Sequence, residues 1–384
     1  MTGRESILDS LSSTFCKTHP MKKKLRVALL FGGKSAEHEI SVISARNIYA
    51  AMDKKKYHVI AIGIDKQGRW FVDEDAQLLN SSDEGKVEFR GTKQMTTVIP
   101  GESRTPLVRR SSGAAFGQVD VVFPVLHGPF GEDGTIQGLL KLANLPFVGA
   151  GVLGSALGMD KDVMKRLLRD ARVPIAKFVA FERADSKTIR FATIKAALGL
   201  PLFVKPANLG SSVGISKVAN RNQFRRAIID AFRYDNKIVI EEAIHGREFE
   251  CSVLGNQHPI ASLPGEIIVQ RDFYSYDAKY LDEQGARFEI PARLPKATVE
   301  KIRALALRSY RVLCCEGMAR VDFFLRDNGE VLVNEINTIP GFTQISMYPK
   351  MWQASGISYS RLIDRLIKLA LERSRREHRL RTSK

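Results

Sequence analysis

Cysteine and tryptophan are scarce in this sequence of 384 residues, which holds four cysteines and two tryptophans. None of the cysteines has a paired C-x-x-C spacing, which argues against a zinc site and against the disulfide framework of a small secreted protein. They stand at Cys16, Cys251, Cys314 and Cys315. This usage is typical of a reducing compartment, and we expect the protein to be cytoplasmic.

Long apolar runs are also absent. No stretch approaches the roughly 20 apolar residues that a membrane-spanning helix needs, so we expect neither a membrane protein nor a membrane partner. With 44% hydrophobic and 26% charged residues, the composition is typical of a globular chain and excludes a disordered or collagen-like protein. A length of 384 residues predicts two or three domains rather than one.

Acidic residues are outnumbered, because 59 Lys and Arg stand against 42 Asp and Glu, for a formal net charge of +17. Such an excess suits a nucleic acid or an anionic substrate, although solvated faces and a basic chain end explain it more simply. Residues 365–384 carry much of the excess but no aromatic side chain, and single strands are bound by stacking on aromatics. We therefore expect no nucleic-acid partner.

Apolar stretches and a helical pattern alternate near the start of the sequence. The segments are residues 27–31, a glycine pair at 32–33, a helical pattern over 40–52 and an apolar run at 58–64. They predict a βαβ unit. Residues 73–117 are polar and weakly periodic and predict a loop-rich excursion, whereas 119–126 and 146–148 predict buried strands. We expect a doubly wound, Rossmann-like α/β domain over 21–160.

Short β-rich segments alternate with helical patterns beyond residue 160. Strands are predicted at 178–181, 202–205, 238–242 and 248–254, and helices at 161–171 and 297–313. Residues 319–325 and 330–336 predict a hairpin that turns at Asp327-Asn328-Gly329. The remaining divisions that we predict are a disordered leader (1–20), two further units (161–247 and 248–373) and a basic tail (374–384).

Two glycine patterns imitate nucleotide-binding motifs. Residues 149–154 match G-x-G-x-x-G, but the acidic residue expected about twenty positions later is Asp170, inside a predicted helix. Close packing or a turn between domains explains these glycines better. Gly33-Lys34-Ser35 resembles the end of a Walker loop, but Ala28 stands where that loop needs its first glycine.

Oxygen-bearing side chains gather in the predicted hairpin. Alternation along 331–337 places Glu335 and Asn337 on one face, and Asp322 on the preceding strand can face them. Two carboxylates and a carboxamide are a donor set for Mg²⁺ or Mn²⁺. An acidic exposed face is the alternative, but the apolar neighbours predict a buried hairpin, where unpaired carboxylates are costly.

A loop of small residues follows the predicted strand that ends at Lys205. Residues 205–214 read KPANLGSSVG, and such a loop lets backbone N–H groups approach a phosphate while Lys205 neutralises its charge. A plain glycine–serine turn is the alternative. Because Mg²⁺ completes its shell with phosphate oxygens and water, the loop and the hairpin together predict a nucleotide site.

Five runs of the sequence, taken together, resemble the D-alanine–D-alanine ligases of the ATP-grasp superfamily. They are GGKSAEHEIS (32–41), HGPFGEDG (127–134), KPANLGSSVG (205–214), ARVDFF (319–324) and NEINTIPGFT (334–343). The likeness extends from residue 25 to about residue 371, with the runs in the family's order. It implies an α/β ATP-grasp fold, in which two α+β subdomains clasp ATP behind a Rossmann-like first domain.

The resemblance implies an ATP-dependent ligation of two D-alanines to D-alanyl-D-alanine, a peptidoglycan precursor, through an acyl phosphate. The partners implied are D-alanine and ATP, with two Mg²⁺ or Mn²⁺ ions, and we expect a homodimer. A D-alanine–D-lactate ligase or another ATP-grasp ligase is one alternative. An inactive nucleotide-binding or nucleic-acid-binding protein on the same scaffold is the other.

The resemblance also implies what individual residues do. The metal ligands would be Asp322, Glu335 and Asn337. The nucleotide would be bound by Lys161, Lys205, Ser211, Ser212, Glu241, Glu242, Glu248 and Lys279, with Glu241 on the adenine amino group and Glu248 on the ribose. The groups implied for catalysis are Glu37, His127, Ser211, Tyr280, Arg320 and the backbone N–H of Gly341, and those implied for substrate binding are Glu37, His127, Ser346 and Met347.

Residues 272–280 (DFYSYDAKY) resemble the lid of the family members that make the dipeptide. In those members the tyrosine matching Tyr280 hydrogen-bonds the serine matching Ser211, which links to the glutamate matching Glu37. Closure of such a lid would exclude water that hydrolyses the acyl phosphate. An aromatic surface loop is the alternative reading of this run.

Overall fold

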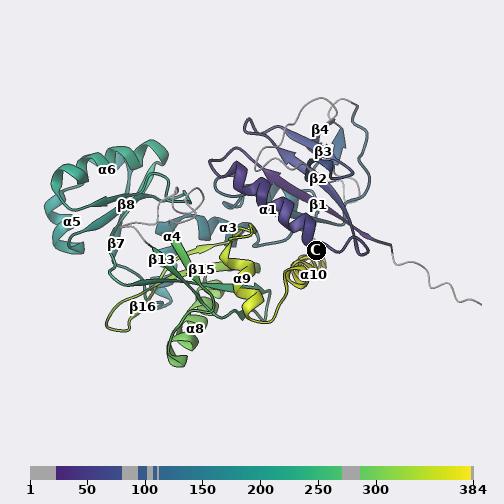
Figure 1. The fold of residues 1–384 in the computed structure, drawn as a ribbon. Coiled ribbons are helices and arrows are strands. Elements are labelled where there is room, and N and C mark those ends of the chain that lie inside the picture. The colour runs from purple at the N-terminus through teal and green to yellow at the C-terminus, as the bar shows by residue number, and fades with distance from the viewer. Residues whose placement is uncertain (1–22, 80–93, 102–106, 110–111, 270–285, 382–384) are drawn as a thin grey trace, which may run out of the picture.

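The computed structural model describes residues 23–79, 94–101, 107–109, 112–269 and 286–381. The predicted leader (1–20) and the lid-like run (272–280) lie outside these residues. The described strands form three sheets, which Figure 1 shows as the purple, teal and green parts of the ribbon. None of the helices in the described part of the chain combines the length and the apolar character needed to cross a membrane.

The first sheet has the strand order β5-β4-β3-β2-β1-β6. Its strands are β1 (Leu25–Gly32), β2 (Tyr57–Ile64), β3 (Trp70–Asp73), β4 (Gln94–Val98), β5 (Leu107–Arg109) and β6 (Val121–Val125). Helix α1 (His38–Ala51) connects β1 to β2, and β1 pairs in parallel with both β2 and β6. The predicted βαβ unit is therefore confirmed.

Two sequence-based predictions for this sheet were wrong in part. The loop-rich excursion expected over 73–117 contains a short helix, η1 (Gln77–Leu79), and also β4 and β5, which extend the sheet by antiparallel pairing. These strands are only five and three residues long, which is too short for a periodic pattern to stand out in the sequence. The strand expected over 146–148 is reduced to one bridge between Phe147 and Val122.

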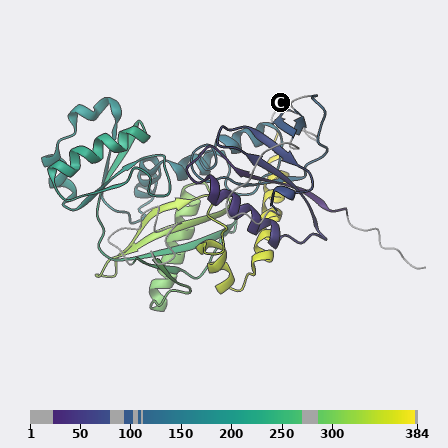
Figure 2. The same ribbon diagram turned by 45° about the horizontal axis from the view of Figure 1, so that its top comes forward.

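The first sheet shares its core with the C-terminal helices. Helices α9 (Met347–Ala354) and α10 (Tyr359–Glu377) contribute to the same apolar cluster as β1, β6 and α1, and Figure 2 shows the yellow α10 beneath the purple sheet. The Arg373 guanidinium on α10 also donates to the carbonyl oxygens of Gly149 and Phe147, the latter at 2.7 Å. This packing fixes the first sheet against the end of the chain.

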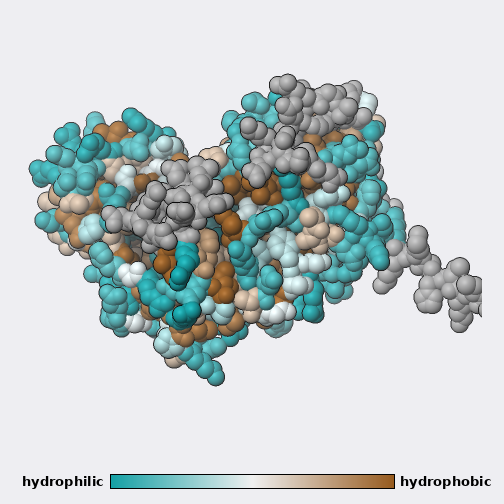
Figure 3. Space-filling view, viewed as in Figure 1, coloured by the Kyte–Doolittle hydropathy of each residue, from teal (hydrophilic) through white to brown (hydrophobic). Residues whose placement is uncertain are grey.

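The second sheet is antiparallel, with the order β7-β10-β8-β9. Its strands are β7 (Phe178–Glu182), β8 (Leu202–Pro206), β9 (Ser216–Val218) and β10 (Lys237–Glu242). A short helix, η2 (Arg183–Thr188), follows β7, and helices α5 (Phe191–Leu198) and α6 (Arg221–Tyr234) cover one face of the sheet and form an apolar core with it. Figure 3 shows this unit as a lobe that a notch separates from the lobe of the first sheet.

The third sheet has the order β14-β13-β11-β15-β16, with β12 paired to β11. Its strands are β11 (Arg247–Gly255), β12 (Ile260–Ala261), β13 (Gly265–Val269), β14 (Ala286–Glu289), β15 (Gly317–Leu325) and β16 (Val331–Asn337). Helices α4 (Lys161–Asp170) and α8 (Lys296–Val312) share its core. β15 and β16 pair antiparallel as the predicted hairpin.

Of the glycines in residues 149–154, Gly154 serves close packing, which was one of the two explanations that the sequence favoured, whereas a Cβ atom on Gly151 would meet no atom within 4 Å. Helices α2 (Thr135–Leu142) and α3 (Val152–Met159) follow the first sheet. Within α3, a Cβ atom on Gly154 would lie 2.7 Å from the carbonyl oxygen of Cys314. The helix therefore approaches the backbone before β15 at a distance that only glycine permits.

Candidate active site

Two cavities adjoin where the three sheets meet. The larger, of about 440 Å³, lies between the second and third sheets, and its volume falls within the range of ligand pockets. The smaller, of about 100 Å³, lies between the first and third sheets. Gly210, Ser211 and Glu335 line both cavities, so a group passed from one ligand to another would be exchanged there.

The β15–β16 hairpin brings the three implied metal ligands together. Asp322 lies opposite Glu335 in the strand register, and the Asn337 Nδ2 donates to Asp322 Oδ2 at 3.0 Å. The register shifts between Asp322 and Phe323, so β16 accommodates one extra residue there. Such a bulge re-aims neighbouring side chains and is common beside active sites.

The chemistry of this donor set fits a hard divalent cation, because all three side chains offer oxygen. In the described residues, no group of three or more His, Cys, Asp or Glu side chains is arranged as a metal site. The candidate set consequently depends on the amide oxygen of Asn337 and on ligands from the substrate, as is usual for Mg²⁺.

Arg320 lies beside these carboxylates and lines the smaller cavity. Its Nε and Nη2 donate to the two oxygens of Asp322, each at 2.7 Å. Burial acts to lower the pKa of Arg320, but the charges of Asp322 and Glu250 outweigh it and raise this pKa well above its usual value. The guanidinium is thus a fixed positive charge beside the candidate metal ligand Asp322.

Lysines border the larger cavity where phosphates would lie. Lys161, at the start of α4, donates to the carbonyl oxygen of Leu209, and its Nζ lies 3.8 Å from Glu335 Oε2. Burial lowers the pKa of Lys161, opposed by the attraction of Glu335. Lys205, at the end of β8, forms an ion pair with Glu241. For Lys205 the attraction of Glu241 outweighs burial and raises the pKa.

The three glutamates that the resemblance assigns to the nucleotide all line the larger cavity. Glu241 is buried between Lys205 and Lys165, whose Nζ lies 3.0 Å from its Oε2. Burial alone would raise the pKa of Glu241, but the two lysines lower it to about 2. Glu242 pairs with Arg326 at 3.0 Å, and Glu248 lies on β11, across the cavity.

The loop after β8 connects the second sheet to the first. Ser211 and Ser212 have φ angles of 51° and 61°, in the left-handed region that non-glycine residues seldom adopt. Outliers of this kind persist where the surroundings hold them, and they cluster at ligand sites. The Ser211 hydroxyl donates to Oε1 of Glu37, and Glu37 is the residue before α1. The serine–glutamate link that the resemblance implies is therefore present.

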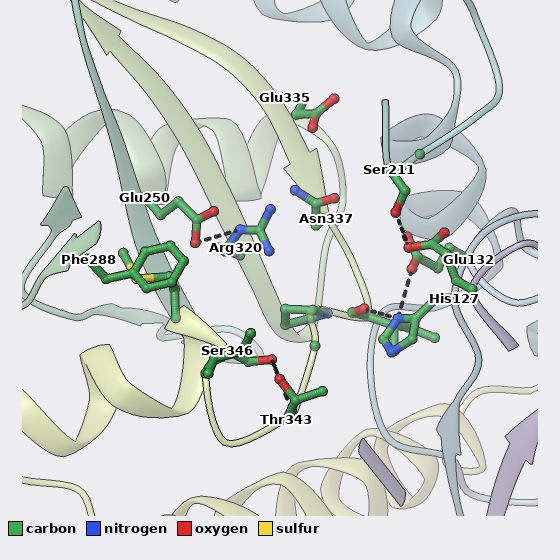
Figure 4. Close-up of a pocket in the computed structure, with 17 residues that line it drawn as sticks. His127, Glu132, Ser211, Glu250, Phe288, Arg320, Glu335, Asn337, Thr343 and Ser346 are labelled. Atoms are coloured by element: carbon green, nitrogen blue, oxygen red, sulfur yellow. Dashed lines mark hydrogen bonds and ion pairs between the residues drawn. The ribbon is translucent and has the colours of Figure 1, made fainter. Parts of the chain in front are cut away.

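His127 is buried beside the smaller cavity. Its Nδ1 lies 3.0 Å from the carbonyl oxygen of Ile339 and 3.4 Å from Glu132 Oε1, as Figure 4 shows for the histidine and the glutamate. Burial acts to lower the pKa of His127, but the hydrogen bond and charge of Glu132 raise it above its usual value. Nε2 is buried and has no hydrogen-bond partner among the described residues, so it is available to a ligand.

The turn between β16 and α9 forms the floor of the smaller cavity. Ser346 Oγ accepts a hydrogen bond from Thr343 N at 2.9 Å and lies 2.8 Å from Thr343 Oγ1. A Cβ atom on Gly341 would lie 2.7 Å from Ser346 Oγ, so this backbone has no room for a side chain. Met347 begins α9 and is buried.

Two predicted residues cannot be placed, because Lys279 and Tyr280 lie outside the described residues. Conversely, three buried or half-buried groups of the site were missed by sequence reasoning. They are Glu132 beside His127, Lys165 beside Glu241, and Glu250 beside Arg320. Glu132 stands in one of the quoted motifs, and alternation along β11 places Glu250 on the face of Glu248, so both had a usable signal.

Comparisons with known proteins place this arrangement in a family. The family model described as "D-ala D-ala ligase N-terminus" matches residues 26–150, and the one described as "D-ala D-ala ligase C-terminus" matches residues 167–368. The chain is 53% identical over 365 residues to the D-alanine–D-alanine ligase of Oceanobacillus iheyensis, covering 95% of this chain and 99% of that protein. It is also 53% identical over 362 residues to D-alanine–D-alanine ligase A of Escherichia coli K12, covering 94% and 100%.

Solved structures agree with these relatives. The D-alanine–D-alanine ligase from Coxiella burnetii aligns with a TM-score of 0.83 at 39% identity, covering 93% of this chain and 96% of that one. The VanG D-Ala:D-Ser ligase from Enterococcus faecalis aligns with a TM-score of 0.80 at 36% identity, covering 91% and 100%. The predicted ATP-grasp fold is confirmed, and the chain belongs to the D-alanine–D-alanine ligase family.

Proposed function

We propose that this protein joins two D-alanines into D-alanyl-D-alanine at the expense of ATP, for peptidoglycan synthesis. The observation that carries the proposal is the meeting of a nucleotide-sized cavity and a smaller one at Gly210, Ser211 and Glu335. A ligase needs this arrangement, because the terminal phosphate of ATP has to reach the carboxylate of an amino acid. The names of the relatives at 53% identity support the same reaction.

The first half-reaction activates a carboxylate. ATP occupies the larger cavity, where Lys161, Lys205 and the backbone of residues 208–214 neutralise its phosphates. The terminal phosphoryl group passes to a carboxylate oxygen of the first D-alanine, giving an acyl phosphate and ADP. Two Mg²⁺ or Mn²⁺ ions, held by Asp322, Glu335 and Asn337, would supply the positive charge that phosphoryl transfer requires.

The first D-alanine lies in the smaller cavity. Glu37 accepts hydrogen bonds from the ammonium group of this substrate. The Ser211 hydroxyl donates to Glu37 and holds the Glu37 carboxylate in place. His127 directs Nε2 toward the same substrate, while Glu132 and the Ile339 carbonyl fix the ring through Nδ1. These contacts position the carboxylate beside the shared wall of the two cavities.

The second half-reaction forms the peptide bond. The amine of the second D-alanine attacks the acyl carbon, and the tetrahedral intermediate then expels inorganic phosphate. Arg320 and the N–H of Gly341 stabilise the oxyanion, and one such preorganised donor is typically worth about 2.7–4 kcal/mol of barrier. Ser346 and the start of α9 at Met347 receive the second carboxylate, because a helix N-terminus favours an anion.

The identity of the second substrate needs its own test. The VanG neighbour, at 36% identity, is a D-Ala:D-Ser ligase, so a dipeptide that ends in D-serine is one alternative product. The depsipeptide of a D-alanine–D-lactate ligase is another. Identification of the product from mixtures of D-alanine with D-serine or D-lactate decides between them. The proposal predicts D-alanyl-D-alanine as the main product. A depsipeptide or a product with D-serine as the main product would contradict the proposal.

The metal assignment has its own test. Asp322→Ala and Glu335→Ala should abolish D-alanine-dependent ADP release while the circular dichroism spectrum stays that of the wild type. Glu330→Ala, at an exposed carboxylate just before β16, is the matched control and should retain full turnover. Near-normal turnover in either of the first two variants would contradict the metal assignment.

The homodimer is supported by an exposed apolar surface on α2, α3 and the end of the chain. Leu142 is 67% exposed, Leu153 58% and Leu380 68%. Leu153 lines one shallow hollow and Leu380 lines a second, and the two hollows share Lys141 and Glu377. Exposed apolar surface can mark an association site. A second copy on this surface predicts that Leu153→Glu converts a dimer to a monomer in light scattering. A wild-type monomer would contradict the proposal.

The division of the chain and its compartment also remain proposals. The three sheets support units over 21–160, 161–247 and 248–373, although α10 packs on the first sheet. The cysteine usage supports a cytoplasmic location, and Cys251 and Cys315 are buried free thiols. Burial raises the pKa of the Cys251 thiol to about 12, which keeps it protonated and unreactive.

A further inference from the structure

A buried carboxylate that the steps above do not use lies beside Arg320. Glu250, on β11, is 5% exposed and lines the smaller cavity. Its Oε2 lies 3.0 Å from Arg320 Nε, and Figure 4 shows the guanidinium between Glu250 and Asn337. Burying a carboxylate is costly unless it is paired, and Arg320 is a positively charged partner that Glu250 contacts.

The strand register places three carboxylates in one row. Glu250 on β11 lies opposite Asp322 on β15, and Asp322 lies opposite Glu335 on β16. Directly opposed side chains share one face of a sheet, where like charges destabilise the pairing. Arg320 compensates this repulsion, because its guanidinium contacts both Glu250 and Asp322.

A cation that binds Asp322 competes with Arg320 for the oxygens of this carboxylate. In the structure, Arg320 donates to both Asp322 oxygens at 2.7 Å, and Asn337 donates to one of them at 3.0 Å. These three hydrogen bonds use most of the roughly four lone pairs of the carboxylate, so few are left for a metal ion. When the guanidinium turns away, Glu250 is the carboxylate already in contact with it.

We propose that Glu250 is a positioning residue, which retains Arg320 beside the reacting carbonyl when Asp322 ligates its ion. Glu250 and Asp322 both contact the guanidinium of Arg320. The contact with Glu250 weakens the hold of Arg320 on Asp322, so the metal ion binds Asp322 more easily. This contact also keeps the guanidinium directed toward the smaller cavity. The inference rests on the proposed function, because it takes Asp322 as a ligand and Arg320 as a group that stabilises the oxyanion.

The test compares Glu250→Gln, Glu250→Asp and the control Glu316→Gln. Glu316 also pairs with an arginine, Arg376, but lies away from both cavities. Mn²⁺ binding is measured by electron paramagnetic resonance with a non-hydrolysable ATP analogue, and kcat by D-alanine-dependent ADP release. In Glu250→Gln we expect weaker Mn²⁺ binding and a kcat lowered at least about tenfold, since an oxyanion donor is misplaced. Glu316→Gln should change neither quantity.

Glu250→Asp separates contact from charge. Aspartate keeps the charge but is one methylene shorter, so it loses the contact with Arg320 and kcat should stay low. Wild-type kcat in Glu250→Asp, or wild-type Mn²⁺ binding and kcat in Glu250→Gln, would overturn the inference. Asp322→Asn reports on the proposed function separately. If Asp322→Asn binds Mn²⁺ like the wild type, the metal assignment fails. If Asp322→Asn loses Mn²⁺ binding while Glu250→Gln behaves like the wild type, only the inference on Glu250 is rejected.

Discussion

At the residue scale, Glu37 is the contact between two parts of the molecule. It precedes α1, which packs on the first sheet, and it accepts a hydrogen bond from the Ser211 hydroxyl in the loop after β8 of the second sheet. A Cβ atom on Gly128 would lie 3.2 Å from its Oε2, so glycine leaves room for the carboxylate. In the proposed reaction, the ammonium group of the first substrate binds these same oxygens.

Glu37→Gln should therefore lower kcat/KM for D-alanine. A hydrogen bond to a charged group is worth about 1.5–3 kcal/mol, which corresponds to a loss of about 10-fold to 150-fold. Glu39→Gln is the control, because Glu39 lies two residues further on, in the first turn of α1, but pairs with Lys66 at the surface. Steady-state kinetics at varied D-alanine measures both variants. An equal loss in the two would show that helix α1, and not the Glu37 charge, is responsible.

A second prediction concerns acid stability. The folded-state pKa of Glu241 is about 2, below its ordinary value of 4.5. A lowered carboxyl pKa stabilises the fold above the ordinary value, and this contribution is lost as the pH falls from 4.5 toward 2. In Lys165→Met the pKa of Glu241 should be lowered less, because one of the two lysines is gone. The unfolding free energy of this variant should therefore fall less steeply between pH 4.5 and pH 2.

Chemical denaturation at pH 2.5–5 measures this slope, and Lys195→Met, at an exposed lysine of α5, is the control. At neutral pH, Lys165→Met should also lose about 1–3 kcal/mol of unfolding free energy, because Glu241 keeps only Lys205 as its partner. A slope identical to that of the wild type would contradict the assignment of the pKa to this cluster.

The sequence predicted some of these residues and missed others for a physical reason. Glu335 and Asn337 share one strand face, so alternation alone placed them together, and the hairpin turn brought Asp322 opposite. Lys165 could not be predicted as a partner of Glu241, because α4 and β10 are far apart in the sequence. Pairs of this kind depend on tertiary packing, which a local pattern does not contain.

At the element scale, close packing of backbone shapes the site. α3 approaches the residues before β15 at Gly154, and the turn before α9 leaves no space at Gly341. Strong apolar periodicity predicted β1, β6 and the β15–β16 hairpin. The strands β4 and β5 carried no such signal, because they are only five and three residues long.

Gly341→Ala should lower kcat without unfolding the protein. The added Cβ would lie 2.7 Å from Ser346 Oγ, so Ser346, which we propose binds the second carboxylate, has to move. Gly138→Ala is the control, since a Cβ there meets no atom within 4 Å on helix α2, and alanine should stabilise that helix by about 1 kcal/mol. Thermal melts and kcat on both variants check the prediction, and an unchanged kcat in Gly341→Ala would contradict it.

At the scale of the whole molecule, the three sheets are held together unequally. The first sheet and the C-terminal helices share one apolar core, whereas the second sheet has a core of its own. The contacts of the second sheet with the rest include charged and hydrogen-bonded pairs around the cavities, such as Lys161 with Leu209 and Glu37 with Ser211. Ligand binding between the sheets is therefore expected to stabilise the arrangement.

The central claim, that ATP energises a carboxylate by transferring its phosphoryl group, is tested by one isotope measurement. D-alanine labelled with ¹⁸O in its carboxylate is incubated with ATP, Mg²⁺ and the protein, and the released phosphate is examined by mass spectrometry. An acyl phosphate contains one carboxylate oxygen in its P–O bond, and attack by the amine expels that oxygen with the phosphate. The account predicts one ¹⁸O per phosphate for each dipeptide formed. Unlabelled phosphate beside labelled dipeptide would contradict it.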